Sequence, residues 1–416
     1  MSSPGLKPTK GTFQLAGREF PRITWWKDPN LRILYFYILA LIVTNTANGF
    51  DGSMMNGLQS LTYWQDYFGH PTGSKLGLFN CIMSVGSLVG LPLLPSLLDR
   101  YGRKSGIVVG SILMLVGIAL QSGAVNFSMF IAARFLIGVG DVAAVTTAPL
   151  LIAEIAHVQD RAVLVTLCAI SYYSGAFIAA WSTYGTLKIN VSNSRFYNFP
   201  SNTTQSDWAW RAPSVIQGVF TVFMLAIVWF VPESPRFYIS TDQPEKALNM
   251  LAHYHANGNQ DDEIVQLEFA EINSAIAMDK IAGDKSSWLD FVRTPGNRKR
   301  LVLLLAIGFF SQWSGNGLVS YYLNLIMDSI GITDPNTQLI LNGGLTTWNL
   351  VTNTIFAFYV DKFGRRMIYM VSTIGTLIAF TIWTILSAKY ADTQKSGLGT
   401  GVVVMIFIYY FFYNVK

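Results

Sequence analysis

The sequence predicts an all-α membrane protein with about ten membrane-spanning helices, arranged as two related halves of which the second is incomplete. Its 416 residues are 51% hydrophobic and only 13% charged, whereas about 25% of the residues in a soluble chain are charged. Nearly uncharged stretches of about 18 or more residues recur, long enough to cross a hydrocarbon core of about 30 Å. A charged six-residue pattern also recurs six spans apart, which indicates two halves of one design.

Hydropathy places each span in order along the chain. The first half holds spans near residues 33–55, 77–97, 106–124, 127–150, 163–186 and 211–231. The second half holds spans near 301–327, 337–359, 367–388 and 399–416. The chain therefore divides into a tail, a six-helix bundle, a linker and an incomplete bundle of about four helices, at residues 1–32, 33–236, 237–300 and 301–416.

Basic residues fix the expected orientation. The tail and the loops after spans two, four, six and eight hold about 21 Lys and Arg residues, against about six on the other side. The positive-inside rule thus predicts a cytoplasmic N-terminus, and the plasma membrane is the expected location. No signal peptide is recognisable in the polar tail. The net charge of +5 suits cytoplasmic loops facing anionic lipid and needs no nucleic acid.

Two polar segments lie between the spans. In the linker, Asp242 is positioned to cap a helix that begins at Pro244, and a helical face follows that is formed by Ile264, Leu267, Ile272 and Ile276. The loop after the fifth span contains two glycosylation acceptors, Asn190 and Asn202, each followed by the required hydroxyl residue. These acceptors agree with a loop that faces the exterior or a lumen.

The repeated pattern is Asp-basic-aromatic-Gly-Arg-basic. It occupies residues 99–104 after the second span and 361–366 after the eighth. The glycines permit a sharp turn, and the charged residues can pair with helix ends and latch one conformation. Two further charged pairs fit this gating role, although each could also be a surface ion pair that contributes little. The gating candidates are Asp99, Arg100, Gly102, Arg103, Lys104, Glu154, Arg161, Glu233, Arg236, Asp361, Gly364, Arg365 and Arg366, with Glu154 paired to Arg161 and Glu233 to Arg236.

Together with the box Pro-Glu-Ser-Pro-Arg at 232–236, these loops resemble the sugar porters of the major facilitator superfamily over nearly the whole chain. Residues 49–52 (Gly-Phe-Asp-Gly), 179–186 and 314–322 are similar to the fungal hexose and disaccharide permease branch, which includes lactose-permease-like symporters. The resemblance implies a major facilitator fold of twelve spans. It also implies sugar transport by alternating access.

Two ionisable residues lie at membrane depth, where charge is costly and usually functional. They are Asp51 in the first span and Arg134 in the fourth, at depths that differ by about 10 Å. A simpler interpretation is that Asp51 lies in the interface and caps a helix end. The resemblance implies that both residues couple sugar movement to protons, with protonation of Asp51 releasing it from Arg134.

Sugar recognition needs amides for the hydroxyl groups and aromatic surfaces for the ring. The resemblance assigns this role to Gln312, Asn316, Tyr321, Tyr322 and Asn349. Several positions depart from the family pattern. Asn316 is displaced by one position, about 100° around the helix, so it is expected to miss the cavity. A polar contact is replaced by Ala169, and the loop after the fourth span carries His157 and Ala162 where the family has Pro and Gly.

The sequence stops within the expected tenth span, so we expect the chain to be poorly active alone. A nutrient sensor or regulatory homologue that does not transport is the main alternative. An ATP-driven pump is disfavoured because no phosphate-binding Gly-rich loop is present. The four scattered histidines suggest neither a metal site nor an enzyme. Sugar, protons and the lipid bilayer are the expected partners, with no cofactor.

Overall fold

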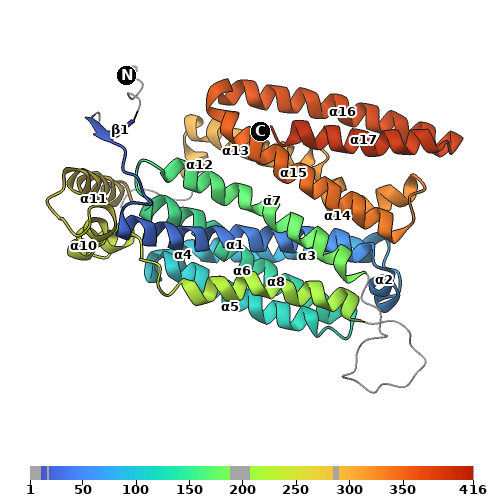
Figure 1. Cartoon of the computed structure of the whole chain (residues 1–416), viewed down its shortest axis with the longest axis horizontal. Helices are drawn as coiled ribbons and strands as arrows, with labels where there is room; N and C mark the ends of the chain where they lie inside the picture. Colours follow the sequence, from blue (N-terminus) through green and yellow to red (C-terminus); the bar gives the residue numbers. More distant parts are fainter. Residues whose placement is uncertain (1–10, 16–17, 188–206, 284–289, 416) are drawn as a thin grey trace.

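The structure is a computed structural model that describes residues 11–15, 18–187, 207–283 and 290–415. Two layers of long helices lie side by side, with a smaller helical unit at one end (Figure 1). Within the described residues, nine helical segments are long and apolar enough to cross a membrane. The predicted eighth span, which is not among these nine, is also a long helix, α15 (Pro335–Phe363), but amides such as Asn342 and Asn349 make it more polar.

The first bundle is the lower layer of Figure 1. Its helices are α1 (Pro29–Gln59), α2 (Thr62–Phe68), α3 (Gly73–Gly90), α4 (Leu94–Tyr101), α5 (Arg103–Ser122), α6 (Phe127–Ile155), α7 (Arg161–Thr186) and α8 (Trp208–Ile227). A short 3-10 turn, η1 (Leu91–Leu93), joins α3 to α4, so that these three elements form one span.

The second bundle is the upper layer. Its helices are α13 (Pro295–Trp313), α14 (Asn316–Ser329), α15, α16 (Arg365–Thr393) and α17 (Ser396–Tyr413). The predicted seventh span is interrupted, because Gly315 between α13 and α14 has a positive φ of 107°. This break lies where the sequence has amides on both sides, Gln312 and Asn316.

Capping residues explain why several helices begin before the apolar stretches that predicted them. The Asp28 side chain accepts hydrogen bonds from the backbone N–H groups of Asn30 (3.1 Å) and Leu31 (3.0 Å), so α1 begins at Pro29 rather than near residue 33. Asp334 caps α15 in the same manner through the Thr337 N–H. Hydropathy alone does not detect these polar first turns.

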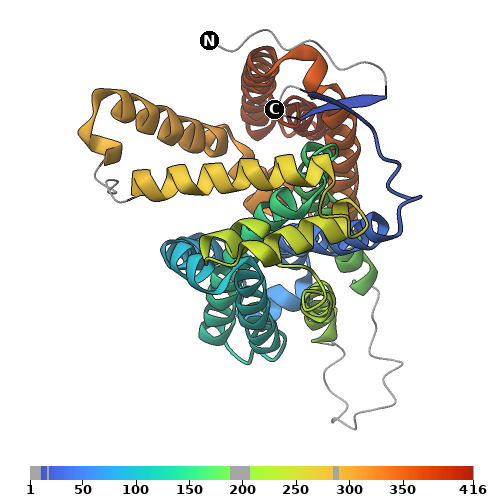
Figure 2. The same cartoon turned by 90° about the vertical axis from the view of Figure 1, so that its left-hand side faces the viewer.

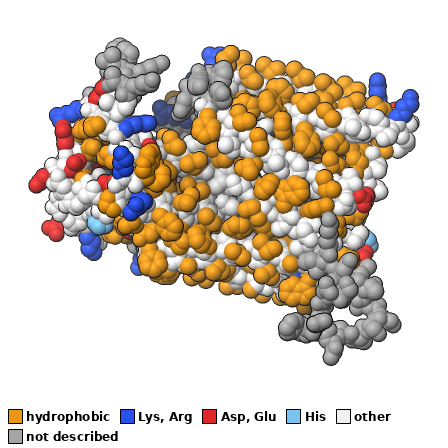
Figure 3. Space-filling model, viewed as in Figure 1, with side chains coloured by type: hydrophobic (Ala, Val, Ile, Leu, Met, Phe, Trp, Pro, Cys, Tyr) orange, Lys and Arg blue, Asp and Glu red, His pale blue; other side chains and the backbone are white. Residues whose placement is uncertain are grey.

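Apolar side chains cover the middle of the molecule, whereas charged side chains gather around α10 (Pro244–His255) and α11 (Glu263–Gly283) (Figure 3). Exposed residues on this band include Leu88, Val219 and Leu377. Such a band is what a chain surrounded by lipid requires. We call the end of the bundles next to α10 and α11 the linker end, and the other the opposite end.

The linker unit packs on the first bundle. It comprises α9 (Pro235–Ser240), α10, α11 and α12 (Asp290–Arg293), and Figure 2 shows α10 and α11 lying across the end of the helix layers. Met250, Leu251 and Val265 join a core with residues of α1 and α6. An antiparallel hairpin of β1 (Thr12–Leu15) and β2 (Arg18–Pro21) packs beside them.

Three of the four residues of the expected apolar face of α11 pack as predicted: Ile264 and Leu267 lie on the hairpin residues and Ile272 on the first-bundle core, whereas Ile276 belongs to none of the hydrophobic clusters of described residues. The expected cap at Asp242 is wrong. Gln243 precedes α10 without a side-chain hydrogen bond, while Asp242 has a positive φ of 58° and pairs with Lys280 (3.1 Å). The turn before Pro244 thus points the Asp242 carboxylate away from the first turn of α10.

Candidate functional site

A polar cavity of about 370 Å³ lies between the two bundles. We call it the central cavity. The first bundle contributes residues of α1 and α7, and the second contributes residues of α13, α14, α15 and α17. Its lining includes Ser53, Asn56, Tyr172, Tyr173, Gln312, Asn316, Tyr321, Asn342, Asn349, Tyr410 and Tyr413. Amides and aromatic rings therefore meet here from six helices.

The structure brings four of the five predicted sugar-binding residues to this cavity: Gln312, Asn316, Tyr321 and Asn349. Tyr322 does not line it and instead packs beside the first-bundle core that contains Phe79 and Trp64. The expectation that Asn316 misses the cavity is also wrong. Because α13 ends before Gly315 and a new helix, α14, begins at Asn316, the Asn316 side chain lines the cavity. Its Oδ1 accepts hydrogen bonds from Ser320 and Tyr410, both at 3.1 Å.

Two amides that line the cavity, Asn342 and Asn56, were not predicted from the sequence. Asn342 and Asn349 are seven residues apart on α15, with Thr346 between them, so all three share one helical face. The Nδ2 atom of Asn342 and the Oδ1 atom of Asn56 are buried and make no hydrogen bond to described residues. The polar stripe on α15 could have predicted Asn342. No comparable signal marked Asn56, which depends on how α1 crosses α14.

The bundles touch at the opposite end. The Tyr321 carbonyl accepts hydrogen bonds from Asn80 (2.8 Å) and Gln59 (3.3 Å), and the Asn324 amide donates to the Gln59 carbonyl (3.1 Å). These bonds close the central cavity on that side. Tyr172 and Tyr173 also line a second hollow, of about 370 Å³, that extends along α7 and α15 past Ala169 toward the linker end.

Asp51 and Arg134 lie close enough for their charges to interact and are almost fully buried, at 0% and 3% exposure. Asp51 is two turns inside α1, so the helix-cap interpretation is wrong. No ion pair within 4.0 Å joins them among the described residues. Arg134 instead donates to the Met83 sulfur (3.6 Å), and Asp51 accepts no hydrogen bond within 3.5 Å, although the Gln217 side chain lies near enough to interact with it. The guanidinium and the carboxyl are neighbours but separate.

The loop at residues 99–104 is a tight junction. Gly102 has φ +87°, and a Cβ added there would lie 2.5 Å from a Glu233 carboxylate oxygen. That carboxylate accepts the backbone N–H groups of Arg103 (3.0 Å) and Lys104 (3.1 Å), while the Arg103 side chain pairs with Glu154 (3.2 Å) and lies 3.9 Å from Asp99. Only glycine permits this approach.

The charged partners therefore differ from those predicted. Glu154 pairs with Arg103 rather than Arg161, because Arg161 pairs with Glu268 of α11 (3.2 Å). Glu233 bonds to the start of α5 rather than to Arg236, whose side chain is exposed. No pattern in the sequence predicts that Glu268 lies beside Arg161.

The second copy of the repeat is only partly described. Gly364 has φ +75°, matching Gly102, and Arg366 is exposed. The side chains of Asp361 and Arg365 lie outside the described part of the chain, as do Asn190 and Asn202. Arg100, whose guanidinium lies over the Tyr101 ring, is exposed at the equivalent corner of the first bundle.

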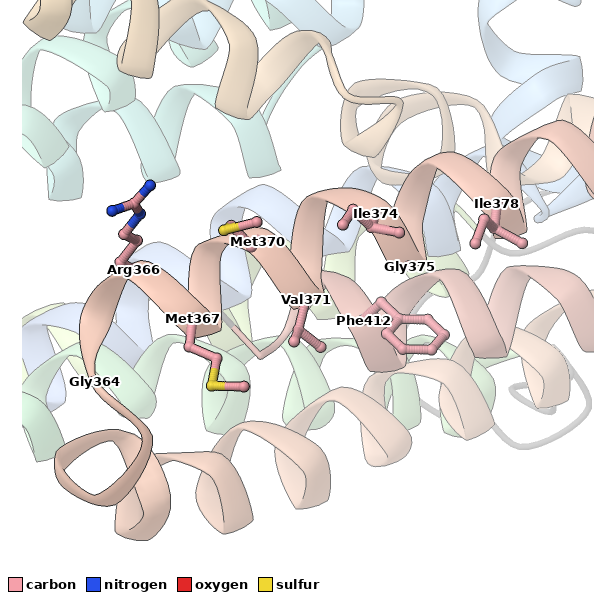
Figure 4. Close-up of a pocket in the computed structure, with 9 residues that line it drawn as sticks. All are labelled: Gly364, Arg366, Met367, Met370, Val371, Ile374, Gly375, Ile378 and Phe412. Carbon is pink, nitrogen blue, oxygen red and sulfur yellow. The ribbon is translucent and has the colours of Figure 1, made fainter.

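A further hollow lies along α16 and α17, and Figure 4 shows its lining. Met367, Met370, Ile374 and Phe412 project into it, and Arg366 lies at one end. Apart from that guanidinium it offers no hydrogen-bonding side chain. A sugar, which needs paired donors and acceptors, does not fit such a surface.

The model of the family described as sugar (and other) transporter matches residues 37–415. A low-affinity glucose transporter of Kluyveromyces lactis is 27% identical over 383 residues, which cover 87% of this chain and 64% of that protein. The glucose transporter mfs1 of Aspergillus flavus is 31% identical over 325 residues, covering 76% and 58%. The chain thus spans less than two thirds of these two relatives.

Among solved structures, the chain is similar to the xylose transporter XylE from E. coli in a partially occluded inward open conformation. The TM-score is 0.71 at 18% identity, over 92% of this chain and 84% of that chain. XylE is described as a major facilitator superfamily protein, and at this identity the likeness concerns the fold alone. The chain belongs to the sugar transporter family and has the all-α fold of the major facilitator superfamily.

Proposed function

We propose that this chain carries a hexose or a disaccharide across the plasma membrane by proton symport with alternating access. The observation that carries the proposal is the buried Asp51 and Arg134 pair beside an amide-lined central cavity between two bundles. A carboxyl group in a dry bundle is costly and is well suited to bind and release a proton. Both relatives named above are glucose transporters.

The cavity chemistry supports a sugar. Amides on four helices, including Asn56, Asn316 and Asn342, offer donors and acceptors for several hydroxyl groups. Tyr172 and Tyr410 contribute aromatic surface on opposite sides. A volume of about 370 Å³ is enough for a monosaccharide, and the adjoining hollow gives room for a second ring.

The closed opposite end and the hollow toward the linker end support an inward-facing state, if the linker end is cytoplasmic as the basic loops favour. In this state Asp51 makes no ion pair with Arg134. We infer that protonation of Asp51 stabilises the separation, and that loss of the proton draws the two together as the opposite end opens. The hydrogen bonds of Gln59, Asn80 and Asn324 would break during that opening.

Replacement of Asp51 by Asn tests the coupling. We expect uptake of labelled glucose or lactose by transporter-deficient yeast to be greater at pH 5 than at pH 7.5, and the variant to lose this acid stimulation because an amide binds no proton at these pH values. The assay compares the chain itself with a version continued after Lys416 by the final helices of the Kluyveromyces relative. Equal stimulation in the variant would show that Asp51 does not couple uptake to protons, and silence from both versions favours a sensor.

Replacement of Asn342 by Ala tests the sugar site. Losing a hydrogen bond to a sugar hydroxyl costs about 1.5 kcal/mol, so we expect the KM for sugar to rise about tenfold with little change in kcat. Thr354→Val, on the exposed side of the same helix, is the matched control. An unchanged KM for Asn342→Ala would remove this amide from the binding site.

A further inference from the structure

A second carboxyl group is buried near the pair, two helical turns further along α6. Asp141 on α6 is 4% exposed. It follows Arg134 by seven residues, which is two helical turns, so both lie on one face of α6. On α1, Asn48 precedes Asp51 by three residues and likewise shares its face. The two helices thus meet in two polar layers, one formed by Asp51 and Arg134 and the other by Asn48 and Asp141.

The hydrogen bonds around Asp141 leave it incompletely satisfied. The Asn48 amide donates to Asp141 Oδ2 (2.5 Å), whereas Asp141 Oδ1 is buried and accepts no hydrogen bond from a described residue. Both oxygens of Asp51 also accept no hydrogen bond within 3.5 Å from a described residue, although the Gln217 side chain lies near enough to interact with this carboxyl group. Asp51 and Asp141 lie close enough for their charges to interact. Two buried carboxyl groups therefore lie near one another, and among the described residues only one of their four oxygens, Asp141 Oδ2, accepts a hydrogen bond within 3.5 Å.

The surrounding elements bring little compensating charge. Arg134 acts on Asp51, and no cation among the described residues is close enough to affect Asp141. The other facing groups are neutral polar side chains of α5, α7, α8 and α14: Gln121, Tyr172, Gln217 and Tyr321. The remaining ionisable side chains of the packed helices α3 and α5 lie at helix ends or on the surface: Lys75, Cys81, Arg103 and Lys104.

The charge balance then decides the protonation of the site. With both carboxyl groups ionised, the three buried groups carry a net charge of −1; with one proton bound, they are neutral. Burying a net charge away from water is strongly unfavourable, and two neighbouring carboxylates do not both stay ionised. The neutral arrangement is therefore the one with a single proton shared between Asp51 and Asp141.

We propose that Asp141 is a second proton-binding residue of this transporter and that it shares one proton with Asp51. The proposal rests on the proton symport proposed above. Binding is a simple protonation, in which a carboxylate oxygen takes H⁺ from water and releases it again. Without Asp141, ionised Asp51 and Arg134 are already neutral together, and adding a proton would leave a net positive charge. Proton binding then requires a more acidic medium.

Asp141→Asn separates this role from a structural one, because the amide keeps the size of the side chain and can still bond to Asn48. We expect acid-stimulated uptake to move by about one to two pH units toward acid, as expected for buried neighbouring carboxyls, while sugar counterflow persists. Asp141→Glu, which retains a carboxyl group, should restore the midpoint toward that of the natural chain. Persisting counterflow with an unchanged midpoint overturns the proposal.

Infrared spectroscopy of the purified chain gives a readout that does not require transport. At pH 7.5 we expect a carbonyl band from a protonated, buried carboxylic acid, and we expect Asp141→Asn to lose it. Absence of the band in the natural chain, or its persistence in Asp141→Asn, refutes the shared proton even if a variant is inactive. Uptake without acid stimulation in the natural chain would contradict symport, and the infrared result would still decide the role of Asp141.

Discussion

Adding one methyl group at Gly175 or at Gly49 is expected to destabilise the first bundle by about 3 kcal/mol or more, the upper range of overpacking effects. A Cβ at Gly175 would lie 1.9 Å from the Thr46 carbonyl oxygen of α1. A Cβ at Gly49 would lie 1.8 Å from the Tyr172 carbonyl oxygen of α7. Each neighbour is backbone, so neither can rotate away, and the two helices must separate.

Thermal unfolding of the detergent-solubilised protein, followed as loss of the monodisperse peak, measures this effect. Gly185→Ala on the same helix α7 is the matched control, because no atom lies within 4 Å of its added Cβ. The double change at Gly49 and Gly175 should cost less than the two single changes together, since the first substitution already separates the helices. A Gly175→Ala midpoint equal to that of Gly185→Ala would show that α1 and α7 do not pack this closely.

Replacing Glu268 by Gln is expected to release α11 from the first bundle. Glu268 is almost fully buried and binds the His255 ring (2.7 Å) and the Arg161 guanidinium (3.2 Å), while the other His255 nitrogen lies 3.1 Å from the Ile155 carbonyl. Breaking a buried pair costs about 3 kcal/mol because the remaining charge is unpaired. Arg161 is 39% exposed, so solvent screening reduces its share and His255 dominates.

The pKa shifts in this cluster predict how the contact depends on pH. Burial lowers the pKa of His255, but the charge and hydrogen bond of Glu268 together with the hydrogen bond to the Ile155 carbonyl raise it more, so the net shift is upward. Burial raises the pKa of Glu268, but the charge and hydrogen bond of His255 together with the charges of Arg161 and His157 lower it more, and the net shift is downward. The His255 contribution is complete below about 6.5 and is lost as pH rises through its raised pKa. The Glu268 contribution is present above about 4.5 and is lost at lower pH.

His157 acts in the opposite direction to His255. Burial, together with the neighbouring His255 charge, lowers the pKa of His157 to about 4. An unfolded His157 takes up a proton near pH 6.5, so its folded contribution is lost as the pH falls from about 6.5 to about 4. The docking of α11 should therefore be tightest at about pH 6 to 7.

Hydrogen exchange of the α11 backbone amides between about pH 4 and pH 7, corrected for intrinsic exchange rates, measures both the release of α11 in Glu268→Gln and the pH dependence of its docking. Glu271→Gln on the exposed side of α11 is the matched control. We expect it to retain the protection of the natural chain, whereas Glu268→Gln loses protection and the pH optimum. Similar protection in the two variants would show that the buried carboxylate does not hold α11 in place.

The fold could be predicted from the sequence because its signals are local. Each apolar stretch is long enough to be a span by itself, and the repeat around Gly102 and Gly364 appears again in the structure as two positive-φ junctions between helices. The boundaries were less accurate, because capping residues such as Asp28 add polar turns. The break at Gly315 was also missed, because the residues on both sides of it have the pattern of one continuous helix.

The candidate site was predicted only in part. Asp51 and Arg134 stand out because charge is rare in a span, yet Asp141, equally charged and seven residues beyond Arg134, was missed. Asn342 was missed as well, although it shares a helical face with Asn349. In both cases the periodicity was visible, but which face meets another helix depends on the packing of α1, α6 and α15.

The sequence by itself determined the order of the long membrane-type helices, the fold class and the family of this protein, because hydropathy and short motifs act over a few residues. Only the tertiary structure decided the partners: Glu154 with Arg103, Arg161 with Glu268, and Asn48 with Asp141. These pairs join residues between 51 and 107 positions apart along the chain. Their formation depends on how helices cross, which side-chain volume and backbone approach determine, and no local pattern encodes it.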